Sequence, residues 1–225
     1  MDSTRSKPLQ PAPAWSHRLG LAGLVVLTVG MLWAAAEFKN VDGTAFNPLH
    51  NFVSELGSAK SSAAAIFNRS LLISGPMIFA MVFTLGIRLR TRLGVAAIVT
   101  GFGALAGLIG VGLESMDSLI PHLIAALCYF WGWLATALLF TIACWRRHHS
   151  IVFASLGTLA ATGAFLAVLT HALLGFVKMT SHEITAFRRP IFWDIAILEW
   201  CVVLSFFAWA LTVIVHLRRD QLTPA

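Results

Sequence analysis

Residues 93–113, LGVAAIVTGFGALAGLIGVGL, contain no ionisable side chain and are long enough to cross the hydrocarbon core of a bilayer as a helix. Five further apolar runs have a similar length. They occupy residues 19–38, 63–87, 121–144, 151–177 and 191–216. The sequence therefore predicts an all-α fold, a polytopic membrane protein with a bundle of six transmembrane helices.

The composition of the whole chain supports this fold class. Of its 225 residues, 58% are hydrophobic and 12% are charged, and the mean hydropathy is +0.80. A soluble domain has about twice that share of charged residues. The net charge of +6 comes from Lys and Arg residues in the short segments between apolar runs. It therefore indicates membrane topology, and nucleic acid is not an expected partner.

The basic residues also predict an orientation. They precede the first run and recur after the second, fourth and sixth, which places them on one side of the membrane. The positive-inside rule makes that side cytoplasmic, in a cell (inner or plasma) membrane. We expect a single transmembrane domain at 19–217, a disordered cytoplasmic tail at 1–18 and a cytoplasmic tail at 218–225. Removal of the first run as a signal peptide, after residues 34–36, is an open alternative.

The outward loop after the first run holds the most polar stretch, AFNPLHNFVSELGSAKSSAAAIFNRS at residues 45–70. Asn47, Pro48 and Gly57 are typical of the start and end of a short helix. A helical wheel separates its apolar from its polar residues, with Leu49, Phe52, Val53 and Leu56 on one side, His50, Asn51 and Ser54 on the other, and Glu55 at the margin. We expect an amphipathic outer-loop helix that lies over the ends of the transmembrane helices. An ordinary interfacial loop helix is the alternative.

Polar residues inside the apolar runs gather in the outer third of the predicted bundle. At 1.5 Å per residue, Asn68 and Arg69 lie about 8 Å deep, His171 about 9 Å and Glu199 about 12 Å. Ionisable groups at such depths cost a few kcal/mol unless they are paired or hydrated, so they suggest a functional site. We expect Arg69 to pair with Glu199 or Asp194, and a purely structural ion pair is the alternative.

Several of these residues are suited to acid/base or metal chemistry. The candidate catalytic residues are His50, Ser54, Glu55, Asp117 and His122. The candidate substrate-binding residues are Asn51, Asn68, Arg69 and Glu199. The candidate metal ligands, for zinc, are His50, His122, His171 and Glu114, although no HExxH spacing supports them. Haem between His122 and His171 is less favoured than zinc, and the sequence alone identifies no cofactor.

Short motifs in residues 47–140 add a resemblance. They are Ser54-Glu55-Leu56-Gly57, Phe67-Asn68, Gly75, Glu114-Ser115-Met116-Asp117 and His122. These motifs resemble an uncharacterised prokaryotic six-helix membrane family related to the eukaryotic FRAG/DRAM/SFK membrane proteins. The resemblance implies a six-helix bundle with its polar loop outside and a role near membrane lipids, because the eukaryotic relatives are associated with glycolipid-anchor remodelling, phospholipid organisation and autophagy. It implies no particular reaction.

These observations predict an integral membrane protein whose outer-leaflet polar site binds or modifies a lipid or a lipid-linked headgroup. A modification would be hydrolysis or transfer, assisted by a metal or by acid/base groups. Two other functions stay open: a non-enzymatic membrane scaffold or regulator, and a proton-coupled carrier that uses Glu199 and His171. Membrane lipids are the expected partners, and the sequence names no protein partner.

Overall fold

The computed structural model describes residues 13–40, 42–145, 148–178 and 192–222. They contain six long helices: α1 (Ala14–Glu37), α2 (Ala64–Arg88), α3 (Arg92–Leu113), α4 (Leu119–Cys144), α5 (His149–Lys178) and α7 (Asp194–Leu222). All six are long and apolar enough to cross a membrane, so the predicted six-helix, all-α fold is confirmed. The helix α1 begins before the predicted run, so residues 14–18 are helical. Residues 218–222, expected in the C-terminal tail, are likewise helical as the end of α7. The tail residues 1–12 and 223–225 lie outside the described residues.

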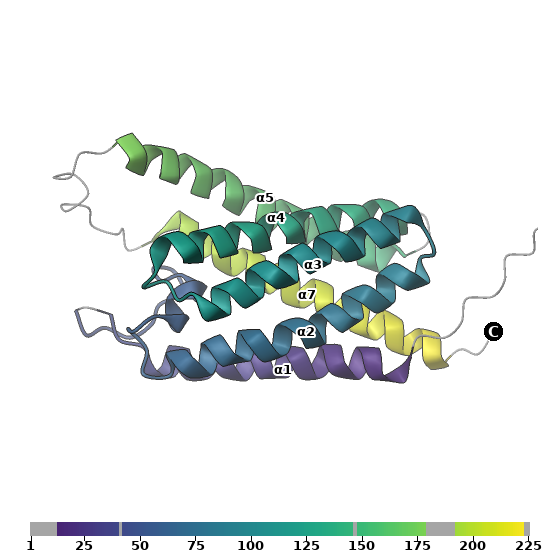
Figure 1. Cartoon of the computed structure of the whole chain (residues 1–225), viewed down its shortest axis with the longest axis horizontal. Coiled ribbons are helices and arrows are strands. Elements are labelled where there is room, and N and C mark those ends of the chain that lie inside the picture. Colours follow the sequence, from purple (N-terminus) through teal and green to yellow (C-terminus); the bar gives the residue numbers. More distant parts are fainter. Residues whose placement is uncertain (1–12, 41, 146–147, 179–191, 223–225) are drawn as a thin grey trace, which may run out of the picture.

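The helices form a ring in which each packs against the next along the chain, and α7 closes the ring by packing against α1 (Figure 1). Small residues bring α3 and α4 close together. A Cβ on Gly107 would collide with the backbone of Tyr129, and one on Gly132 would lie 2.6 Å from the backbone nitrogen of Ala104. Close backbone approach of this kind is typical of packing between helices in membranes.

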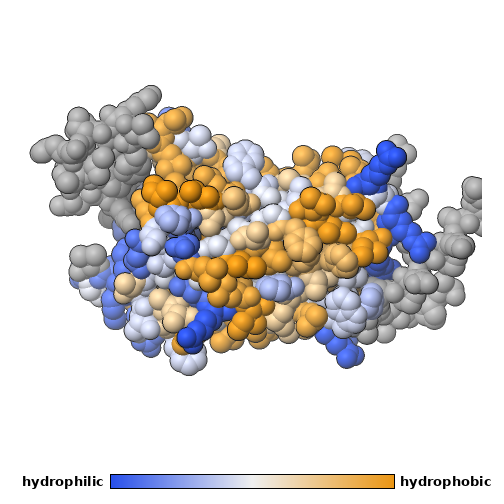
Figure 2. Space-filling model, in the orientation of Figure 1, coloured by the Kyte–Doolittle hydropathy of each residue, from blue (hydrophilic) through white to orange (hydrophobic). Residues whose placement is uncertain are grey.

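The outer surface of the ring is apolar. Large hydrophobic side chains are exposed on several helices, among them Val99, Phe102, Phe153 and Leu204. Figure 2 shows an apolar middle on this face, with hydrophilic residues nearer the two ends. Such a surface is unsuited to water and suited to contact with lipid chains.

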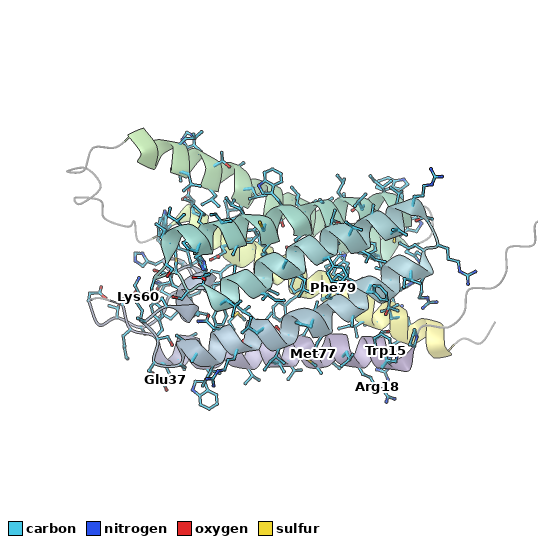
Figure 3. The ribbon with its side chains drawn as sticks, viewed as in Figure 1. Trp15, Arg18, Glu37, Lys60, Met77 and Phe79 are labelled. Atoms are coloured by element: carbon cyan, nitrogen blue, oxygen red, sulfur yellow. The ribbon has the colours of Figure 1, made fainter. Side chains whose placement is uncertain are left out.

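Residues 38–63, apart from residue 41, form a capping segment that lies across one end of the bundle, which we call the loop end (Figure 1). Lys60 and Glu37 lie at this end, and Trp15 and Arg18 lie at the opposite end (Figure 3). Isolated β-bridges fold the segment back on itself, joining Phe38 to Ser61 and Lys39 to Ala45. Aromatic contacts anchor it, because Phe46 meets the Phe38 ring at 5.1 Å and the Trp200 ring of α7 at 5.9 Å.

The expected amphipathic helix is not formed in the capping segment. Residues 47–51 form a turn, and a short 3-10 helix, η1 (Val53–Gly57), follows. Asn51 Oδ1 accepts from the Asn47 amide at 3.0 Å. Glu55 Oε2 accepts from the Phe52 amide at 3.2 Å, which a continuous helix would bond to the Pro48 carbonyl. Val53, Glu55 and Leu56 are all buried, so η1 turns no separate polar face outward.

Candidate functional site

A cavity of about 110 Å³ lies inside the ring and extends from the capping segment toward the middle of the bundle. Helices α1, α2, α3, α4 and α7 form its walls and η1 closes its end. The deeper walls are apolar and include Leu71, Ile78, Phe79, Leu108, Val203 and Phe206. Phe79 marks this region near the middle of the bundle in Figure 3. On α4 one face lines the cavity, at His122, Ala126, Tyr129 and Trp133.

Polar side chains line this cavity mainly near the loop end. Ser54 comes from η1, His122 from the first turn of α4, and Glu199 from the second turn of α7. Tyr129 lies two turns beyond His122 and is close enough to Glu199 for an electrostatic interaction. The cavity therefore has a polar end beneath the capping segment and an apolar interior.

Glu199 joins the capping segment to the cavity. Its Oε2 accepts a hydrogen bond from the Val53 backbone amide at 2.6 Å, and the amide and hydroxyl of Ser54 face the same carboxylate. The side chain is only 7% exposed. The expected ion pair with Arg69 is not formed, since Arg69 is exposed on α2, and the one salt bridge in the described part of the chain joins Lys60 to Glu55. Backbone and hydroxyl donors thus take the place of the predicted guanidinium.

The orientation of His122 is set by a backbone carbonyl. Its Nδ1 lies 2.7 Å from the Glu114 carbonyl oxygen. A carbonyl can only accept, so Nδ1 carries the proton, and in the neutral ring Nε2 is an acceptor. Within the described residues, neither His122 Nε2 nor the Tyr129 hydroxyl has a hydrogen-bond partner. The polar end of the cavity therefore offers groups that a ligand can engage.

Glu55 and Asn51, expected in catalysis and substrate binding, instead hold the capping segment together. Glu55 Oε1 lies 2.6 Å from Lys60 Nζ, and Oε2 accepts from Asn51 Nδ2 at 3.0 Å. Asn51 also donates to Asn40 at 2.9 Å, and its carbonyl oxygen accepts from Trp200 Nε1 at 3.1 Å. Both residues are almost fully buried. These hydrogen bonds stabilise the fold of the capping segment.

The remaining predicted residues lie outside the cavity lining. Asp117 is exposed, and its Oδ2 accepts from the Ala59 amide at 3.0 Å, which ties the α3–α4 connection to the capping segment. Asn68 Nδ2 donates to the Gly57 carbonyl at 3.0 Å. His50 is half-buried in the turn at 47–51, within electrostatic reach of Asp42.

The four candidate metal ligands are not brought together. His122 is buried in the cavity wall, whereas His171 and Glu114 are exposed and His50 lies in the turn of the capping segment. Across the part of the chain that the structure describes, no three His, Cys, Asp or Glu side chains are grouped so as to hold a metal ion. Ser54 also shows no bond to a histidine here, because its hydroxyl contacts Met116 Sδ at 3.5 Å.

Sequence reasoning included Ser54, His122 and Glu199 but missed Tyr129. This residue is the only tyrosine of the chain and follows His122 by seven positions, which is two helical turns. That spacing puts both side chains on one face of α4. It is the feature of the sequence from which Tyr129 could have been predicted to lie beside His122.

Six membrane-length helices, a lipid-compatible outer surface and an internal cavity define a multi-pass α-helical membrane protein. Comparisons with protein-family models, with curated proteins and with solved structures found no match for this chain.

Proposed function

We propose that this protein binds a membrane lipid through the head-proximal part of one hydrocarbon chain, which occupies the central cavity, and that the lipid's polar head lies at the Glu199 end. The observation that carries the proposal is the division of the cavity lining into an apolar interior and a polar end. An amphiphile has the same division. Burial of its chain in the cavity would place its head beside Ser54, His122 and Glu199.

The size of the cavity favours a single chain. An engineered protein cavity of about 150 Å³ admits one benzene molecule. The present cavity, at about 110 Å³, is of that order and is walled by helices along its length. It has room for the few methylene groups of one alkyl chain that lie nearest the head, and it is too small for two chains side by side.

A role near membrane lipids is also what the resemblance to the FRAG/DRAM/SFK-related family implies, and membership of that family is part of this proposal. The proposal is limited to binding. A serine activated by a histidine is not formed in the described residues, where the Ser54 hydroxyl contacts Met116 Sδ and faces the Glu199 carboxylate.

Photochemical labelling tests the proposal. The probe is a monoacylglycerol with a diazirine on the part of its chain nearest the glycerol head, added to the protein in lipid nanodiscs. We expect cross-links to the cavity faces of α2, α3 and α7, mapped by mass spectrometry of peptides. The Val203→Phe substitution should remove these cross-links, because it fills the cavity.

Leu204→Phe is the matched control, because Leu204 follows Val203 on α7 but is exposed on the outer surface. It should leave the cavity cross-links unchanged. Cross-links confined to outward-facing residues, or cavity cross-links that persist in Val203→Phe, would overturn the proposal and favour a scaffold or regulator without a lipid site.

A further inference from the structure

The charges around the cavity restrict which headgroup it can accept. None of the described residues that line it is a lysine or an arginine. Its ionisable lining groups are Glu199, His122 and Tyr129. The lining therefore contains a carboxylic acid and an acceptor nitrogen, with no permanent cation.

Two basic residues at the loop end, Lys60 of the capping segment and Arg69 of α2, are placed elsewhere. Lys60 is held by Glu55, with 2.6 Å between Nζ and Oε1. Arg69 is exposed on the lipid-facing side of α2 together with Ile66 and Ile73, one turn away on either side. Neither one lines the cavity.

Among the described residues, a phosphate or carboxylate head buried beside Glu199 would therefore have no partner of opposite charge. Burial of an unpaired anion is strongly unfavourable, and a like charge nearby makes it worse. A head that donates hydrogen bonds, in contrast, finds acceptors in this lining. The Glu199 carboxylate accepts from Val53 and faces the amide and hydroxyl of Ser54, and its four lone-pair sites leave room for a further donor. His122 Nε2 is an acceptor in the neutral ring.

We infer that the cavity selects amphiphiles whose head is a hydrogen-bond donor, namely a hydroxyl or an amine on a single hydrocarbon chain, and that it rejects phosphate and carboxylate heads. Glu199 and His122 accept from this donor, and the Tyr129 hydroxyl supplies a third contact. This inference rests on the proposed function, because it assigns the headgroup of the lipid whose chain fills the cavity.

A series of probes with chains of equal length tests the inference. Dodecylamine and glycerol monolaurate carry donors, laurate and dodecyl phosphate carry anions, and methyl laurate has neither. Each competes with the diazirine probe for the cavity of the full-length protein in nanodiscs. We expect the two donor probes to compete at concentrations at least about tenfold lower than the other three. One hydrogen bond to a charged group changes the affinity by about this factor or more.

Two variants separate charge from hydrogen bonding. Glu199→Gln removes the negative charge but keeps an oxygen that can accept from the Val53 amide, so dodecylamine should lose about tenfold in potency while glycerol monolaurate loses less. Tyr129→Phe removes only the hydroxyl. Glu37→Gln is the matched control, because Glu37 is exposed at the same end and is not part of the cavity lining.

The outcomes distinguish the two proposals. Equal competition by all five probes, or stronger competition by laurate or dodecyl phosphate, would overturn the headgroup assignment and leave chain binding intact. Failure of every probe to compete, together with absence of cavity cross-links, would overturn the proposed function itself. The series on the unaltered protein is decisive even if Glu199→Gln fails to fold.

Discussion

The Glu199 carboxylate on α7 accepts the Val53 backbone amide of the capping segment at 2.6 Å, across 146 positions of the chain. One side chain therefore lines the polar end of the cavity and also holds the segment that closes it. We expect Glu199→Ala to lower the free energy of unfolding by about 1–3 kcal/mol, because it leaves a buried amide unpaired. Glu199→Gln should cost less. Denaturant titration in detergent and hydrogen exchange at the Val53 amide measure both effects, and equal losses in the two variants would contradict this role.

The Lys60–Glu55 pair should stabilise the capping segment. Lys60→Met leaves the Glu55 carboxylate, which is 2% exposed at its side chain, without its cation. We expect a loss of about 1–3 kcal/mol in the free energy of unfolding, less than for a fully buried pair, because the Lys60 side chain is 31% exposed.

The double variant Lys60→Met, Glu55→Gln should recover part of this loss, because no unpaired charge is then buried. Lys39→Met, at an exposed lysine of the same segment, is the control. If the double variant is no more stable than Lys60→Met, the loss does not come from the unpaired carboxylate.

A side chain at Gly57 should be destabilising. A Cβ at this position would collide with Oδ1 of Asn68. The Nδ2 atom of the same side chain donates to the Gly57 carbonyl. Gly57→Ala should therefore cost about 1–3 kcal/mol, as expected for overpacking. Gly103→Ala, with no atom within 4 Å of its Cβ, should cost far less. Thermal unfolding of Gly57→Ala with and without Asn68→Ala checks the cause, since removal of the Asn68 amide should relieve the collision.

The turn at Asp42 should depend on pH. The hydroxyl of Thr44 donates to Asp42 Oδ1 at 2.7 Å and the Thr44 amide donates to it at 3.0 Å, and these two bonds lower the pKa of the carboxyl. The stability that they supply is present above the unfolded pKa and is lost as the pH falls through the folded pKa.

Thr44→Val should raise the pKa of Asp42 toward its ordinary value, because it removes the larger contribution. Titration of carbon-13-labelled aspartate followed by NMR measures the change. An unchanged Asp42 pKa in this variant would show that the hydroxyl bond does not set it.

The six spans could be predicted because membrane thickness fixes the length of each apolar run, whatever the run packs against. The run at 93–113 became α3 (Arg92–Leu113) almost without change. The capping segment could not be predicted in the same way. Its apolar and polar residues have a helical period, yet Asn51 and Glu55 are both buried and bond to the backbone. Local side-chain bonds therefore overrode the pattern.

The sequence predicted how deep the candidate residues lie in the membrane, but only some of these residues line the cavity. Counting residues from a helix end gives the depth of a side chain, so Glu199, His122 and Arg69 were all placed near one end of the bundle. The direction in which each side chain points depends on how the helices pack. The structure turns Glu199 and His122 inward and Arg69 outward, so the ion pair predicted from depth alone is absent.

The order of the ring has a consequence for how the protein is made. Helices α2 to α5 can each pack on the preceding helix as soon as it is in the membrane, because neighbours in the ring are neighbours in the chain. The last helix, α7, contributes one wall of the cavity, contacts both α5 and α1, and brings Glu199 to Val53. A chain whose synthesis has stopped before α7 has neither a closed cavity nor a fastened capping segment. Completion of α7 is thus the step at which the cavity comes into existence.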